Sequence, residues 1–221
     1  MVYYTCEVCF FQSMYKNDYK RHLKTLKHKH KYSLQNEWIL QEYIDNPLLF
    51  NNKKFHIRCY YLYTFFNNTP NAYIYQEGNI YTAKNDFKNE FYNDKNIHDT
   101  HLGSTDKDYY FPNDLDCSHE KKNKIQKQIN SLASNLFKIM KGKCYSENIN
   151  CYELFGVDIM ISDNLEVKLI EVNNKIGLAY VKEKDFFIEL LDDVLELTMD
   201  KEFINQKISK SKEKKNKFLK L

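Results

Sequence analysis

Two carboxylates and one amide in the C-terminal half have the types and spacing needed to hold a cation. Asp158 and Glu171 stand in two short apolar runs, and the polar segment Ser162-Asp163-Asn164 between those runs is typical of a hairpin turn. Because side chains alternate along a strand, Glu171 and Asn173 share a face, and Asp158 can join them within about two residues of the position opposite Glu171. Carboxylate and amide oxygens are the ligands that magnesium takes alongside phosphate oxygens. The sequence therefore predicts a magnesium site formed by Asp158, Glu171 and Asn173.

The alternative for this hairpin is an amphipathic pair of strands with a solvated acidic face. The segment Ile170-Glu171-Val172 embeds a charge in an otherwise apolar strand, which favours the metal site over that alternative.

A second ligand pattern lies near the N-terminus. The pattern Cys6-x2-Cys9-x12-His22-x5-His28 has the spacing of a Cys2His2 zinc finger. Two thiolates on a hairpin knuckle and two histidines on a following helix would complete a tetrahedron, and His30 is an alternative to His28. So small a domain has little core, so zinc would supply much of its stability. We predict a ββα finger over residues 1–32.

The finger carries seven Lys or Arg against two acidic residues, which predicts weak, salt-sensitive binding to nucleic acid. Its wide histidine spacing resembles that of matrin-type fingers associated with double-stranded RNA. A single finger reads about three base pairs, so sequence-specific DNA recognition is not expected. A structural or protein-binding role is the alternative.

The elements that must position these groups can be placed from hydrophobic periodicity. We predict buried strands over 38–44 and around 54–58, and a hairpin of 72–75 and 80–82 that turns at Glu77-Gly78. In a strand, Lys54, His56 and Arg58 share one face. Helices are predicted over 119–141 and 186–197, with inward stripes at Ile125, Ile129, Leu132, Leu136 and Ile139, and at Phe187, Leu190, Leu191, Val194 and Leu197.

Several motifs resemble those of the tubulin–tyrosine ligase-like family, a branch of the ATP-grasp ligases. The motifs occur in that family's order over about residues 38–199. They are FGVDIMI with the following LIEVN, Gln41-Glu42-Tyr43-Ile44-Asp45-Asn46-Pro47, Lys54-Phe55-His56-Ile57-Arg58, and Ile74-Tyr75-Gln76-Glu77-Gly78. The resemblance implies an α+β fold that forms the C-terminal part of an ATP-grasp domain, over 38–206.

The resemblance also implies a function. The main chain of Gln41, Glu42, Tyr43 and Ile44 would contact adenine, and Lys54 and Arg58 would lie near the phosphates and the acceptor carboxylate. ATP and magnesium would serve to activate a carboxylate of a protein substrate as an acyl phosphate. An amino acid amine would then displace phosphate to form an amide bond.

Three departures from the family pattern stand out. His56 replaces an acidic residue in the Lys-Phe-Asp-x-Arg motif, Tyr81 replaces an arginine, and the His-Leu-Thr-Asn motif reads His101-Leu102-Gly103-Ser104. In addition, only about 37 residues precede Trp38, whereas the first half of an ATP-grasp site normally lies upstream. A reduced site, or a partner chain supplying the missing half, is therefore expected. The alternative is a non-catalytic adaptor that binds nucleic acid or protein through the finger.

Composition sets the remaining expectations. The chain of 221 residues has a net charge of +3, but residues 207–221 alone hold seven Lys against one Glu, so a basic, disordered tail is predicted there. No run is long and apolar enough for a membrane span, and no signal peptide opens the sequence. Six irregularly spaced cysteines favour a reducing compartment, so a cytoplasmic location is expected.

Overall fold

The structure is a computed structural model that describes residues 41–90, 92–103, 108–141, 150–174, 176, 184–200 and 215–221, together with the backbone of 4–6 and 11–13. It divides into two compact units, residues 1–43 and 44–221, which are described separately. The predicted zinc ligands Cys9, His22 and His28, and the alternative His30, lie outside the described residues.

In the N-terminal unit, strands β1 (Tyr4–Cys6) and β2 (Phe11–Ser13) form an antiparallel pair in which Cys6 lies opposite Phe11. Cys6 therefore ends the first strand of a hairpin, as the predicted knuckle requires. The hairpin is confirmed, and the zinc site stays a prediction.

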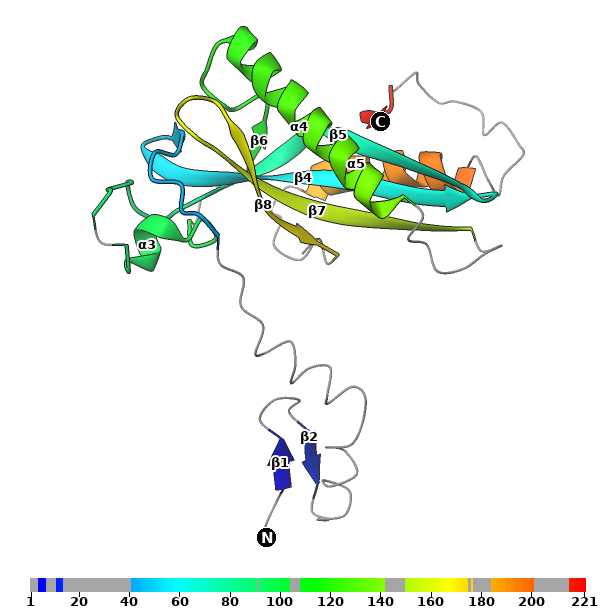
Figure 1. Ribbon diagram of the computed structural model, residues 1–221, viewed down its shortest axis with the longest axis horizontal. Helices are drawn as coiled ribbons and strands as arrows, with labels where there is room; N and C mark the ends of the chain where they lie inside the picture. Colours follow the sequence, from blue (N-terminus) through cyan, green and yellow to red (C-terminus); the bar gives the residue numbers. More distant parts are fainter. Residues whose placement is uncertain are drawn as a thin grey trace. The chain divides into compact units, whose positions relative to one another are not determined.

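The larger unit is built on one antiparallel sheet with the strand order β6-β5-β4-β7-β8, on which β3 pairs with β4 and β9 pairs with β5 (Figure 1). Its strands are β3 (Leu49–Phe50), β4 (Lys53–Phe66), β5 (Thr69–Thr82), β6 (Tyr109–Phe111), β7 (Cys151–Ile161), β8 (Val167–Asn173) and β9 (Phe218–Lys220). Its helices are α3 (Lys95–His98), α4 (His119–Met140) and α5 (Lys184–Leu195), the last continued by the π-helical turn η2 (Glu196–Asp200).

The central strand β4 is buried on both faces, and alternation sorts its side chains between them. Its odd-numbered residues, including Phe55, Ile57 and Tyr61, pack in the main core against Ile125 and Ile129 of α4. Its even-numbered Tyr60 packs on the other face against Phe186, Phe187 and Leu190 of α5. Lys54, His56 and Arg58 belong to this second face, as the sequence predicts.

The two predicted helices are confirmed, with small changes in which residues they bury. Helix α4 begins after Ser118, whose side chain accepts a hydrogen bond from the Lys121 amide, which is a typical N-cap. Ile139 was expected in the core but is 60% exposed, because the last turn packs through Phe137 and Met140 instead. In α5 the prediction was also wrong for Leu191, which is exposed, while Phe186 is buried in its place.

Three other expectations are wrong. Residues 69–82 form one continuous strand, and Glu77-Gly78 marks a bulge opposite β4 and not a turn. Of the strand predicted over 38–44, the described residues 41–44 do not form a strand, and Gln41, Glu42 and Tyr43 are exposed. Finally, residues 215–221 are not disordered. β9 pairs with β5, and Lys217 forms ion pairs with Glu77 and Glu189 at 2.9 and 3.0 Å, which gives this basic segment specific partners.

None of the helices in the described part of the chain is long and apolar enough to cross a bilayer.

Candidate functional site

A bidentate ion pair joins β4 to β7 at the centre of the sheet. Arg58 lies directly opposite Asp158 in the strand register, so both side chains leave the sheet on the same face. The Arg58 Nε donates to Asp158 Oδ1 at 2.8 Å, and Nη2 donates to Oδ2 at 2.7 Å. The Asp158 side chain is only 3% exposed, and the hydrogen bond to it raises the pKa of Arg58. A buried carboxylate is thus held in one fixed orientation.

The pairing of β7 with β8 brings the other two predicted ligands to this carboxylate. Asp158 lies opposite Glu171, and Gly156 lies opposite Asn173. The Asn173 Nδ2 donates to Glu171 Oε1 at 2.7 Å and lies 3.4 Å from Asp158 Oδ2. All three side chains therefore converge on one face, as the spacing predicts. Their role as magnesium ligands stays a prediction.

The donor set fits a hard divalent cation. An amide N–H dipole bridges the two carboxylates, which shows that their oxygens are close enough to share one positive partner. Rotation of the Asn173 amide about χ2 would present Oδ1 in place of Nδ2 and complete an all-oxygen set. Glu171 is exposed, so the site is open to solvent on the β8 side.

The other predicted residues are placed less centrally. Lys54 lies on the same face of β4 and is buried, and this burial lowers its pKa to about 8 against the opposing pull of Asp45. The adenine-contacting role was predicted from a buried strand, and that strand is not formed by Gln41, Glu42, Tyr43 and Ile44. These residues fall at the boundary between the two units, so their role stays a prediction.

A cluster of aromatic rings beside the ion pair was not foreseen. His56 stacks on Tyr81 of β5 with ring centroids 5.1 Å apart, and the His101 ring lies 4.7 Å from His56. The Arg58 guanidinium lies over Tyr81 at 5.6 Å. Strand alternation placed His56 on the correct face, but the register of His56 opposite Tyr81 depends on the bulge at Gly78. His101 belongs to a motif already noted in the sequence, but its place beside His56 depends on a loop and does not follow from strand alternation.

Burial of His56 leads to a prediction about pH. The side chain is 4% exposed, and burial lowers the pKa of His56 to about 3, with the positive charge of Arg58 adding to this effect. Between about pH 3 and 6.5 the unfolded chain binds a proton at this residue and the folded chain does not, so stability falls as the pH is lowered.

In the wild-type protein, protonation of His56 in the unfolded chain should lower the free energy of unfolding by about 1.4 kcal/mol as the pH falls from about 7.5 to about 5.5. Urea unfolding at both pH values checks it, with His56→Gln expected to lose that part of the pH dependence. The exposed His119 provides the control, because His119→Gln should keep the wild-type dependence. Equal dependence in all three proteins would contradict the assignment.

Comparison with known proteins identifies the family of this chain. The sequence model of the tubulin-tyrosine ligase family matches residues 17–141 and 113–207, which together span most of the chain. The chain belongs to the tubulin-tyrosine ligase family. The match includes all strands of the described sheet except β9, and it begins inside the segment predicted as a finger.

Individual relatives in the tubulin-tyrosine ligase family are distant in sequence. A probable tubulin polyglutamylase of Caenorhabditis elegans is 28% identical over 163 residues, covering 67% of this chain and 39% of that protein. A probable tubulin–tyrosine ligase of Schizosaccharomyces pombe is 28% identical, covering 62% of this chain and 35% of that protein. A probable tubulin–tyrosine ligase of Saccharomyces cerevisiae is 29% identical, covering 72% and 24%. The chain thus spans less than half the length of these relatives.

Proposed function

We propose that this chain carries the magnesium-binding part of an ATP-dependent ligase that joins an amino acid to a carboxylate of a protein substrate. The observation that supports it best is the convergence of Asp158, Glu171 and Asn173 beside Arg58 on three adjacent strands. The family relatives are named for tubulin modification, so tubulin or another protein with acidic side chains is the proposed substrate class.

In this proposal each residue has a distinct task. Asp158, Glu171 and Asn173 would hold magnesium. ATP would supply the phosphoryl group, and the magnesium ion would neutralise the charge on it. Arg58 fixes the Asp158 carboxylate and places a second positive charge at the same edge of the site. Lys54, whose buried amine loses its proton more readily than an exposed lysine, would contact a phosphate or carboxylate oxygen from the same face.

The relatives extend well beyond the matched region, so groups that complete the ATP site would come from sequence outside this chain or from a partner chain. Gln41, Glu42 and Tyr43 are exposed, so such a completing element would have access to them.

The proposal is tested by replacing the exposed carboxylate of the set. Glu171→Gln should abolish Mg-ATP binding measured by isothermal titration, because a neutral amide removes one of two anionic ligands. Glu166→Gln is the matched control, since Glu166 is an exposed glutamate on the same hairpin and should leave binding unchanged. Equal Mg-ATP affinity in wild type and Glu171→Gln would mean that the magnesium ligands are wrongly assigned.

A second candidate function is favoured by the hairpin at Tyr4–Cys6 and Phe11–Ser13. We propose that residues 1–32 form a zinc finger, with Cys6, Cys9, His22 and either His28 or His30 as ligands, that binds nucleic acid through backbone phosphates. This adaptor role is compatible with ligase activity or with its absence.

The finger should bind zinc in the full chain, and Cys6→Ser/Cys9→Ser should lose one equivalent by metal analysis after zinc-replete expression. Binding of double-stranded RNA should weaken steeply as salt rises, because contacts to phosphates release counterions. An affinity that does not change with salt would rule out the electrostatic mode, and an unchanged zinc content in the double variant would rule out the finger.

A further inference from the structure

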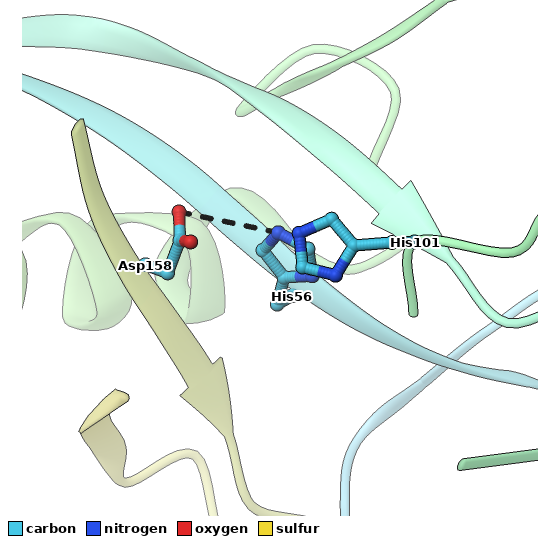
Figure 2. A group of neighbouring side chains, drawn as sticks. All are labelled: His56, His101 and Asp158. Carbon is cyan, nitrogen blue, oxygen red and sulfur yellow. Dashed lines mark ion pairs between the residues drawn. The ribbon is translucent and has the colours of Figure 1, made fainter. Parts of the chain in front are cut away.

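We propose that His56, His101 and Asp158 form a binding site for a divalent transition-metal ion of the zinc class. One ligand atom from each side chain lies within 4.8 Å of the other two (Figure 2). Two of the three ligands are imidazoles, and only Asp158 is shared with the proposed magnesium set. The site therefore adds a metal of different chemistry to the edge of the proposed ligase site.

His56 is oriented as a metal ligand would be. Its Nδ1 lies 2.6 Å from the Thr100 hydroxyl, and its Nε2 is buried without a hydrogen-bond partner among the described residues. That Nε2 lies 4.0 Å from Asp158 Oδ1. Figure 2 marks this pair with a dashed line. If Nδ1 carries the proton and donates it to Thr100, the Nε2 lone pair faces a carboxylate oxygen. Two acceptors that face each other in a buried place call for a cation between them.

The charge state of His56 agrees with this geometry. Burial lowers the pKa of His56 to about 3, so the ring is neutral at physiological pH, which is the form that ligates metals. A protonated ring would occupy Nε2 and compete with the ion.

His101 supplies the adjustable ligand. Its side chain is 58% exposed, and its ring lies beside His56. Gly103 makes this position possible, because its amide donates to the Thr82 carbonyl at 2.9 Å and a Cβ there would overlap that carbonyl oxygen. The close approach holds the loop against the end of β5, so that His101 reaches the site.

The main opposing influence is Arg58, whose positive charge disfavours a nearby cation. Asp158 can still serve both partners, because each carboxylate oxygen has two lone pairs and accepts from more than one direction. Two further carboxylates offset the guanidinium, since Glu171 and Asp99 both act on His56 in the direction that favours positive charge.

The ligand types select the class of metal. Imidazole nitrogen suits zinc, nickel, copper and iron, whereas magnesium prefers oxygen. Ligands about 2.1 Å from a tetrahedral ion lie roughly 3.4 Å apart, so the 4.0 Å between His56 Nε2 and Asp158 Oδ1 must contract by about half an ångström, and rotation of exposed His101 brings the third ligand into range. Three protein ligands leave the fourth position of a tetrahedral ion open to water or to a carboxylate or phosphate oxygen. Carboxylate and phosphate groups are also what the neighbouring proposed ligase site would bind.

The test uses the full chain with Cys6→Ser/Cys9→Ser, so that the proposed finger does not contribute. Isothermal titration with ZnCl2 should show one binding site, and adding His101→Gln should weaken it at least about 100-fold. The control is His119→Gln, at an exposed histidine on α4, which should leave zinc affinity unchanged. In the Co2+-loaded chain, the ion should shift exchangeable imidazole N–H resonances, and His101→Gln should remove one of them.

No zinc binding in this background, or equal affinity in the His101→Gln protein, would overturn the inference. Adding Glu171→Gln separates it from the proposed ligase function, because that change should remove Mg-ATP binding but weaken zinc binding much less than His101→Gln does, through the loss of one nearby negative charge. Loss of zinc binding with Glu171→Gln would show that a single oxygen-rich site takes both ions, and would also overturn the inference.

Discussion

Replacing Arg58 by methionine should lower the free energy of unfolding by about 3–5 kcal/mol, because it leaves the buried Asp158 carboxylate without its charged partner. The Asp158 side chain is 3% exposed and receives two hydrogen bonds from the guanidinium at 2.7–2.8 Å. Urea unfolding of the two proteins measures the difference.

Two comparisons make this result specific to the buried pair. Lys168→Met breaks an ion pair of similar length between half-exposed side chains, Lys168 and Glu166, and should cost at most about 1 kcal/mol. Arg58→Met combined with Asp158→Leu should recover most of the lost stability, since removal of both charges leaves neither member of the pair buried without its partner. If Arg58→Met cost no more than Lys168→Met, the Asp158 carboxylate would not depend on Arg58 for its charged partner.

The second large effect is expected at Gly78, where β5 bulges against β4. A Cβ at Gly78 would lie 2.7 Å from the Arg58 carbonyl oxygen and 2.9 Å from Ile57 Cγ2. Because the first of these atoms belongs to the backbone, the two strands must move apart, so Gly78→Ala should cost about 1–3 kcal/mol. The same displacement should disturb Arg58 and weaken Mg-ATP binding.

Gly156 provides the matched control on the opposite side of β4. A Cβ there would lie 3.4 Å from Arg58 side-chain atoms and 3.5 Å from Ile176, which is ordinary van der Waals contact. Gly156→Ala should therefore leave stability nearly unchanged in the same urea experiment. Equal losses from the two substitutions would show that strand spacing at Gly78 is not the cause.

The parts of the site that sequence alone predicted are those set by alternation within one strand or across one tight hairpin. Glu171 and Asn173 share a face by alternation within β8, and a short turn pairs β7 with β8, but Asp158 stands opposite Glu171 only because the register shifts between Asp158 and Ile159. Lys54, His56 and Arg58 share a face by the same alternation within β4. The amphipathic helix 119–140 was also predictable, because its apolar stripe extends over many turns.

The parts that sequence did not predict depend on pairing between distant segments. Gly78 indicated a turn because glycine is common in turns, and only the approach of β4 shows that it serves a bulge. The Lys-rich segment 215–221 was predicted to be disordered from its composition. Its order comes from contacts with Glu77, Glu189 and the edge of β5, which are distant in sequence. His101 reaches the cluster only through the loop that Gly103 holds against Thr82.

The partners in the Arg58–Asp158 pair stand 100 residues apart, and every contact of β4 with β7 spans a comparable length of chain. Closing such long loops costs entropy before any favourable contact forms, and this slows folding. No local segment can bring Arg58 to Asp158 in advance, so the ion-paired site does not assemble before the sheet. It should therefore appear in the same cooperative step as the sheet, and its amides at Arg58 and Asp158 should exchange with solvent only when the whole unit unfolds.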